Sequence, residues 1–290
     1  MGNYEIYTDS CCDLPKEIVE KRNIKIMQLE VTVDNNAPVL NRDIESKAFY
    51  DQLRAGANAK TNAVTPGFFE EHMRKSLEEE KDILYLGFSS GLSVTYNNGV
   101  MVMSELQDEF PERKLMHVDT LCASVGQGLL VYYAAELRDA GAAIEEVFKK
   151  VMEAKDYIHH LVTVDDLFFL KRGGRLSAVS AIAGSMLKVK PIILIDDEGH
   201  LNNVATVRGR KNALKDLYER MKGSEKFAEL PYVFISHADC MDDAKYIERM
   251  INEDYPAVKV VISDIGPVVG AHTGPGGLAV CFLGKTIKGQ

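Results

Sequence analysis

The sequence lacks what a membrane-spanning or secreted protein needs. No uninterrupted apolar run in its 290 residues approaches the ~18 residues that cross a bilayer. The first residues, Met1 to Glu5, have neither the basic nor the apolar region of a secretory signal. These absences predict a chain with no integral membrane segment that stays in the compartment where it is made.

The sequence also lacks cysteines arranged to form disulfides or a zinc site. The five cysteines are an odd number, none of them forms a C-x-x-C pair, and Cys11 and Cys12 are adjacent. This arrangement offers neither a disulfide framework nor the spacing of a zinc site. Because free thiols persist where the surroundings are reducing, we expect a cytoplasmic protein.

Positive charge is scarce, and several enzyme motifs are absent. The 34 basic residues are outnumbered by 43 acidic ones, which gives a formal charge of −9. A nucleic-acid-binding protein needs a clustered basic face, so we expect no DNA or RNA partner. The sequence contains no G-x-x-x-x-G-K-[ST] and no H-E-x-x-H, so neither a nucleoside triphosphatase nor a zinc hydrolase is indicated, and we expect no metal or cofactor.

The first half of the chain alternates short apolar runs with amphipathic stretches. Such runs predict strands, and a period of 3.6 residues predicts helices. Their alternation predicts an α/β fold with a parallel sheet covered on both faces, which we assign to an N-terminal domain of residues 1–156. The expected strands are residues 4–8, 24–33, 83–88 and 115–118, and the expected helices are 15–22 with Asp13 as N-cap, 45–53, 66–79, 94–106, 123–137 and 144–155.

The second half includes at least one antiparallel pair of strands. Asp196-Asp197-Glu198-Gly199 between two apolar runs is the strongest hairpin signal in the chain. We therefore expect a C-terminal α+β domain of residues 157–290. Its expected strands are residues 157–164, 192–195, 201–207, 232–236, 258–263 and 278–282, and its expected helices are 165–171, 176–189, 210–221 and 242–252.

A serine-rich turn follows the strand at residues 83–88. Ser89, Ser90 and Ser93 lie between that strand and the helix predicted to begin near Val94. The carboxyl ends of strands in an open α/β sheet are where ligands bind, and the first turn of a helix offers unpaired N–H groups that favour an anion. The sequence therefore predicts a site for a small negative group at this turn.

The same turn also matches a hydrolase motif. Gly87-Phe88-Ser89-Ser90-Gly91 fits G-x-S-x-G, and His272 lies downstream of it. No acidic residue stands out as a third member of a triad. A serine hydrolase using Ser89 and His272 remains the alternative, and a phosphate-ester enzyme built on Arg172, Arg175 and Arg208 is a weaker third hypothesis.

Four other stretches could carry chemistry, and each has an ordinary structural explanation. Residues 60–66 form a polar loop in which Thr65 serves equally well as a helix N-cap. Residues 170–177 place two glycines beside two arginines. The arginines could bind a carboxylate or phosphate. Alternatively, the stretch is an ordinary helix C-cap with solvated arginines. Residues 266–277 form a Gly- and Pro-rich loop around His272, and a lone His is more often structural. Residues 208–211 put positive charge at a helix start, against the helix dipole, although a solvated face is the default explanation.

Taken together and in order, these motifs resemble the DegV family of bacterial fatty-acid-binding proteins. The resemblance covers nearly the whole chain. The residues that carry it are Thr8-Asp9-Ser10, Asp13-Leu14-Pro15, Lys60-Thr61, Ser89-Ser90-Gly91-Leu92-Ser93 with Thr95-Tyr96, Asp119-Thr120, Leu170 to Ser177, Lys190-Pro191-Ile192 and Gly270 to Gly276. The resemblance implies two α/β domains with one long-chain fatty acid between them, and a carrier rather than an enzyme. It further implies that the bound acid is presented to a fatty-acid kinase, on the way to phospholipid synthesis.

The resemblance also implies which residues hold the fatty-acid carboxylate. It places the carboxylate at Thr61 and Ser93, with three further residues beside it. A buried carboxylate needs several donors, which hydroxyls and an oriented His can supply. Two positions depart from the family pattern: Asn62 replaces a second hydroxyl residue and can still donate, and Val94 replaces a Gly, which bears on the acyl length accepted. The three further residues are His272, Thr273 and the nearby Arg172.

A docking face for the kinase is expected around the carboxylate site. A kinase must reach the carboxylate while the acyl tail stays buried. Arg208, Arg210 and Lys211 carry the positive charge that the local helix does not require. We therefore expect these residues to form part of that face.

Overall fold

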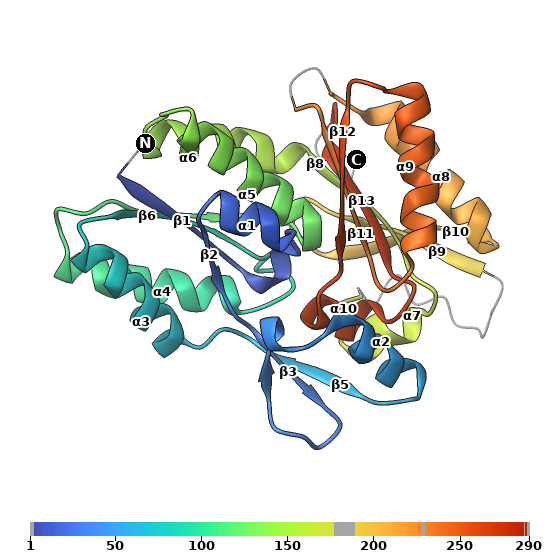
Figure 1. Cartoon of the computed structure of the whole chain (residues 1–290), viewed down its shortest axis with the longest axis horizontal. Helices are drawn as coiled ribbons and strands as arrows, with labels where there is room; N and C mark the ends of the chain where they lie inside the picture. Colours follow the sequence, from blue (N-terminus) through green and yellow to red (C-terminus); the bar gives the residue numbers. More distant parts are fainter. Residues whose placement is uncertain (1–2, 177–188, 228–229, 287, 289–290) are drawn as a thin grey trace.

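The computed structural model describes residues 3–176, 189–227, 230–286 and 288, and their strands form three sheets (Figure 1). The first sheet is four-stranded and fully parallel, in the order β2-β1-β6-β7. Its strands are β1 (Tyr4–Asp9), β2 (Ile24–Met27), β6 (Asp82–Gly87) and β7 (Leu115–Asp119). The parallel sheet predicted for the first half of the chain is confirmed.

The second sheet has six strands in the order β10-β9-β8-β13-β11-β12. Among its described strands, only β11 and β12 pair in parallel, and β9 and β10 form the predicted antiparallel hairpin. Its strands are β8 (Ile158–Thr163), β9 (Val189–Ile195), β10 (Leu201–Arg208), β11 (Tyr232–His237), β12 (Lys259–Asp264) and β13 (Leu278–Leu283). The expected α/β fold class, with a parallel sheet and a further mixed sheet, is confirmed.

A small third sheet corrects two expectations. β3 (Glu30–Val33) pairs with β4 (Val39–Leu40) and β5 (Ala59–Asn62), so residues 24–33 are two strands in different sheets. The chain leaves the first sheet at Leu29, whose N–H donates to Ser10 Oγ over 3.0 Å instead of continuing a ladder. β5 overlaps residues 60–66, which the sequence suggested were a loop. Its short polar run has no strand pattern of its own and forms a strand by pairing with β3.

The helices follow the predicted ones closely. Thr65 caps α3 through its side chain, which accepts from Phe68 N–H, so its structural explanation is confirmed. The helix predicted over residues 176–189 lies largely outside the described residues. The helices are α1 (Lys16–Lys21), α2 (Ser46–Arg54), α3 (Pro66–Glu78), α4 (Thr95–Glu109), α5 (Ser124–Asp139), α6 (Ile144–Ala154), α7 (Leu167–Arg172), α8 (Arg210–Ser224), α9 (Met241–Asp254) and α10 (Pro267–Thr273), with 3-10 turns at Ser10–Cys12, Asn41–Asp43 and Lys155–Tyr157.

Two details of the predicted elements are wrong. Asp13 does not cap α1; the N-cap position is Pro15, which makes no side-chain hydrogen bond. The backbone of Asp13 is left-handed (φ 47°), and its carboxylate turns into the interior. The segment that contains His272 is not a loop but the helix α10. Pro267 fits the first turn of that helix, and Gly274 (φ 69°) ends it, so both residues mark helix boundaries rather than a loop.

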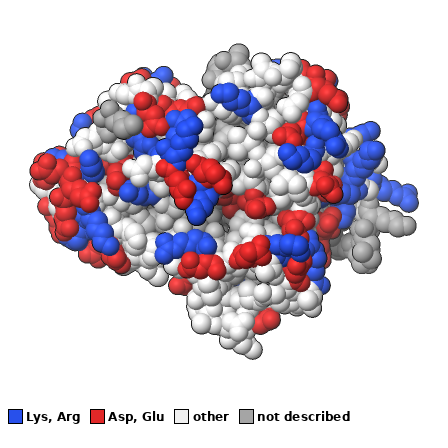
Figure 2. All heavy atoms as spheres, viewed as in Figure 1, with Lys and Arg blue, Asp and Glu red and all other residues white. Residues whose placement is uncertain are grey.

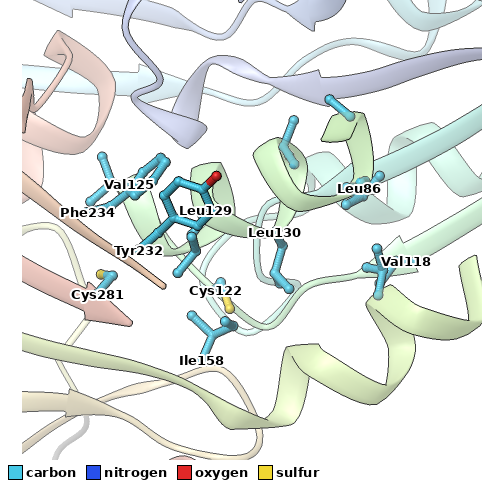
Figure 3. Close-up of a cluster of buried hydrophobic side chains, with 14 of the residues drawn as sticks. Leu86, Val118, Cys122, Val125, Leu129, Leu130, Ile158, Tyr232, Phe234 and Cys281 are labelled. Atoms are coloured by element: carbon cyan, nitrogen blue, oxygen red, sulfur yellow. The ribbon is translucent and has the colours of Figure 1, made fainter. Parts of the chain in front are cut away.

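Helix α5 is the element that joins the two larger sheets. Its buried residues Leu129 and Leu130 lie between Leu86 and Val118 of the first sheet and Phe234 of the second (Figure 3). The predicted close packing of this helix is confirmed at its glycines: a Cβ on Gly126 would lie 1.9 Å from His160 Nε2. Since α5 packs against both sheets, the domain boundary near residue 156 stays a prediction.

Candidate functional site

A cavity of about 520 Å³ lies where segments of all three sheets meet. Its volume falls within the range of pockets that hold small-molecule ligands, roughly 300–1,000 Å³. Most of the wall is apolar and includes Leu29, Phe88, Leu92, Leu170, Leu201 and Val268. The polar side chains on it include Thr61, Asn62, Ser93, Arg175, His272 and Thr273. The structure thus brings five of the six predicted carboxylate-binding residues to one cavity.

Thr61 and His272 meet in this wall, although 211 positions separate them in the chain. His272 Nε2, on α10, lies 2.9 Å from Thr61 Oγ1 at the third residue of β5. Burial, together with the charges of Arg175 and Arg172, lowers the pKa of His272 to about 4. The imidazole is therefore neutral at physiological pH, and it can hold the Thr61 hydroxyl in place without adding charge to the cavity.

The other nitrogen of His272 is enclosed by the turn that follows α7. Nδ1 is buried and has no hydrogen-bond partner among the described residues. A Cβ on Gly173 would lie 2.2 Å from it. If the proton is on Nε2, the imidazole donates to Thr61 Oγ1 and leaves the threonine O–H free to donate into the cavity. Gly173 is thus required by the close approach of the imidazole ring.

Ser93 stands at the end of the serine turn, which we define as residues 89–93. Its N–H and that of Leu92 donate to the Ser89 carbonyl over 3.1 and 3.0 Å. Its Oγ lies 3.0 Å from Thr95 Oγ1 at the start of α4. The buried Asp9 fixes the beginning of this segment, because its carboxylate accepts from Phe88 N–H over 2.8 Å. Val94 follows Ser93 on the cavity rim with its side chain exposed.

The arginines of the stretch 170–177 are divided between the surface and the cavity. Arg172 is exposed and does not line the cavity; its guanidinium lies 4.9 Å from the centre of the Phe169 ring. Arg175 does line it, and its Nε donates to the Leu92 carbonyl over 3.1 Å. Helix α7 ends at Arg172, and Gly174 (φ 68°) reverses the chain, which turns Arg175 back toward the cavity. Sequence reasoning placed Arg172 near the carboxylate, and the glycine pair was the signal that could have indicated Arg175 instead.

The groups needed for the two enzyme hypotheses are not assembled. Ser89 Oγ is fully buried and donates to the Gly199 carbonyl over 2.8 Å, whereas His272 Nε2 is engaged with Thr61. Arg208 lies exposed at the end of β10 and is not part of the cavity wall that contains Arg175. Neither a Ser89–His272 pair nor a three-arginine cluster is present among these contacts.

The three residues predicted to contact a partner differ in their surroundings. Arg210 is part of an internal ion-pair network, with Nε 2.7 Å from Asp243 Oδ2 and Nη1 3.7 Å from Asp165 Oδ1. Local stability therefore explains the charge of Arg210, contrary to the sequence argument. Lys211 is exposed with Nζ 5.8 Å from the centre of the Tyr246 ring. Basic side chains project at the right-hand edge of Figure 2, where Figure 1 places α8 and β10.

Asp13 anchors the start of the segment that carries His272. Its buried carboxylate accepts from Gly266 N–H over 2.9 Å and from Ser124 Oγ over 2.6 Å. Tyr50 and Asn41 add bonds to the Ile265 carbonyl and the Val268 N–H. Side chains from the first half of the chain therefore hold the backbone that leads into α10.

The free energy of unfolding should depend on pH because the buried carboxyl of Asp13 titrates. Burial is the main cause that raises the pKa of Asp13, to about 8. An acid with a raised folded-state pKa binds more protons when native than when unfolded, so stability falls as pH rises toward 8. Between pH 6.5 and 8 we expect the free energy of unfolding to fall by about 1.5 kcal/mol. One titrating group can change it by at most roughly 1.4 kcal/mol per pH unit, which is about 2 kcal/mol over this interval.

Urea unfolding of the Asp13→Asn variant checks this expectation. The variant should show a flatter pH profile than the parent over pH 6.5 to 8, because an amide does not titrate. The control is Asp108→Asn on α4, which neutralises an exposed carboxylate that is not among the groups acting on Asp13 and should leave the parent profile unchanged. An identical decline in the parent and in Asp13→Asn would show that another group is responsible.

These features define a ligand-binding α/β protein. Its largely apolar cavity carries hydroxyl, imidazole and guanidinium groups, which suits an elongated apolar molecule with a polar or anionic end. The chain belongs to the DegV family: the profile described as "uncharacterised protein, DegV family" matches residues 3–285.

Individual relatives are similar over their whole length. A DegV domain-containing protein of Clostridium perfringens is 42% identical over 288 residues, which are 99% of this chain and 99% of that protein. The crystal structure of DegV, a fatty-acid-binding protein from Bacillus subtilis, is similar with a TM-score of 0.84 and 28% identity, covering 98% of this chain and 100% of the other. A DegV family protein of Thermus thermophilus, described by its fatty-acid binding, has a TM-score of 0.86 and 26% identity, covering 97% and 99%.

In the described part of the chain, no helix combines the length and the apolar character needed to cross a bilayer.

Proposed function

We propose that this protein binds one long-chain fatty acid in the cavity, with its carboxylate at Thr61 and Ser93. The observation that carries the proposal is the Thr61–His272 hydrogen bond in the wall of an otherwise largely apolar cavity. Apolar side chains accommodate an acyl chain at a gain of about 0.8 kcal/mol per buried methylene. The fatty acids bound by the Bacillus subtilis and Thermus thermophilus relatives support the same ligand class.

The remaining polar groups complete the proposed carboxylate site. Thr273 is buried beside His272, and Asn62 is exposed next to Thr61, with its Nδ2 3.2 Å from Glu30 Oε2. Arg175 supplies positive charge from the wall, and Arg172 supplies it from outside. A carboxylate held by several donors and near a guanidinium stays ionised despite its burial. The ligand then lies between the proposed domains, residues 1–156 and 157–290.

We further propose that the protein is a carrier in the bacterial cytoplasm that presents the acid to a fatty-acid kinase. Among the residues that the structure describes, the site contains donors for a carboxylate but no assembled nucleophile and base, which supports binding rather than catalysis. All five cysteines are free, and four of them are buried, which fits a reducing compartment. The kinase would phosphorylate the carboxylate for phospholipid synthesis.

Denaturing extraction of the purified protein, followed by lipid mass spectrometry, tests the ligand. We expect about one fatty acid per chain when the protein is made in a bacterial host. The apo protein should then rebind an added C16 or C18 acid at the same ratio. Recovery of no acyl species, together with no binding of the added acid, would exclude the carrier function.

The proposed docking face is tested by Arg208→Ala. Arg208 is exposed, whereas Arg210 is held by Asp243 and Asp165, so only the first substitution leaves the internal network intact. We expect the variant to retain fatty acid but to reduce acyl-phosphate formation by the cognate kinase about tenfold, in the range of a lost charged contact.

The matched control is Lys149→Ala on α6, which removes an exposed positive charge elsewhere. A coupled kinase assay on lipid-loaded proteins measures both variants. Equal rates for Arg208→Ala and the parent would place the docking face away from β10 and α8.

A further inference from the structure

The hairpin between β9 and β10 contacts the serine turn through a residue that the proposed fatty-acid site does not use. Ser89 is fully buried, and its Oγ donates to the Gly199 carbonyl over 2.8 Å. The same oxygen accepts from Gly91 N–H over 3.2 Å. One hydroxyl thus binds both its own turn and the hairpin tip, which we define as residues 196–200, although 110 positions separate Ser89 from Gly199.

Glycines on both sides allow this contact. Gly199 has φ 81°, and a Cβ there would lie 2.1 Å from Ser89 Oγ. On the opposite side, a Cβ on Gly91 would lie 2.8 Å from the Glu198 carbonyl oxygen. A side chain at either position would displace the facing atom, so both positions favour glycine. The hairpin tip and the serine turn are therefore shaped to fit each other, and we call this contact the clasp.

The clasp joins two parts of the cavity wall. Leu92 and Ser93 belong to the serine turn and line the cavity, and Leu201, directly after the hairpin tip, also lines it. The first two residues follow β6 of the parallel sheet, whereas Leu201 begins β10 of the six-stranded sheet. Arg175 adds a bond to the Leu92 carbonyl. The wall therefore has a seam between segments of different sheets, and Ser89 is bonded across it.

We propose that Ser89 is a positioning residue that holds this seam closed and thereby sets the rate at which the bound fatty acid leaves. The proposal rests on the proposed function. An acyl chain enclosed by the wall leaves when the wall segments separate, and a hydrogen bond across the seam makes that separation rarer. The G-x-S-x-G pattern then serves a contact between sheets: Ser89 supplies the donor, and Gly91 leaves room for the hairpin.

Two variants weaken the clasp in different ways. Ser89→Ala removes the donor to Gly199, and we expect release to be about two- to tenfold faster, the range for one net hydrogen bond. Gly199→Ala directs a methyl group at Ser89 Oγ from a left-handed backbone, so we expect a larger acceleration. The measurement is the dissociation rate of cis-parinaric acid, a fluorescent C18 fatty acid, from loaded protein into excess phosphatidylcholine vesicles.

Each variant has a control matched in chemistry. Ser76→Ala removes a buried serine on α3 that bonds Tyr7 and Glu5 and does not line the cavity. Gly141→Ala imposes a similar backbone strain (φ 95°) with no atom within 4 Å of the new methyl group. These controls should release the acid at the parent rate. Release rates are compared together with each variant's loss of thermal stability, which separates the clasp from general destabilisation.

The outcomes distinguish failure of this proposal from failure of the proposed function on which it rests. Loading of the parent with cis-parinaric acid is measured first, and failure to load would exclude the proposed function. If the parent loads but both clasp variants release at the parent rate while folded, Ser89 does not position the wall. Equal acceleration in the clasp variants and in their controls would also overturn the proposal, because it would assign the effect to stability.

Discussion

Thr61→Val should weaken fatty-acid binding by about ten- to a hundredfold. The substitution keeps the shape of the side chain and removes the hydroxyl that His272 holds at 2.9 Å. A hydrogen bond to a charged group contributes about 1.5–3 kcal/mol, which corresponds to that range of affinity. The measurement is a titration of delipidated protein with an 18-carbon acid at pH 7.

The partner substitution shows whether the two residues act together. We expect His272→Ala to reduce affinity about as much as Thr61→Val, and the double variant to cost less than the sum, because the residues are in contact. Thr65→Val is the control: it removes a nearby threonine hydroxyl that caps α3 and does not line the cavity. Unchanged affinity in both single variants, with the fold retained, would place the carboxylate elsewhere.

Ala123→Phe should remove long acids from the binding range while sparing short ones. Ala123 lines the cavity in an extended conformation (φ −137°, ψ 159°) that any residue can adopt, and its N–H bond to His160 does not involve its side chain. A phenyl ring there would displace roughly four methylenes of a bound chain, at about 0.8 kcal/mol each. Affinity for an 18-carbon acid should therefore fall about a hundredfold.

An acid-length series distinguishes blocking from unfolding. A 10-carbon acid, which needs less of the cavity, should bind Ala123→Phe about as well as it binds the parent. Ala140→Phe adds the same ring at an exposed position beyond α5 and should change neither affinity. If Ala123→Phe binds the 18-carbon acid like the parent, the acyl chain does not occupy this cavity.

Local pattern was sufficient to predict much of the fold. The runs around β1, β6 and β7, and the periodic helices between them, predicted the parallel sheet because buried strands and amphipathic helices are specified by neighbouring residues. The turn at Asp196–Gly199 predicted the β9–β10 hairpin for the same reason. The polar stretch at residues 59–62 has no such pattern, and it forms β5 only because β3 lies beside it.

The candidate site shows where sequence reasoning was limited. Thr61, Ser93 and His272 could be named from the motifs they share with a known family. Their proximity could not be derived locally, because it depends on α10 packing beside β5 across more than 200 positions. Arg175 was considered with Arg172 as a possible carboxylate or phosphate ligand but was not assigned to the carboxylate site, since a linear sequence does not show that the Gly173-Gly174 turn directs it inward.

The sequence by itself determined the order and type of most elements, the serine turn and the absence of long apolar runs, because these depend on residues close along the chain. Only the tertiary structure decided what the buried polar groups do. Asp13, expected to cap a helix, binds Gly266, and Ser89, a candidate nucleophile, binds Gly199. A buried polar atom must be paired, and the partner that satisfies it is set by packing between distant segments rather than by its neighbours in sequence.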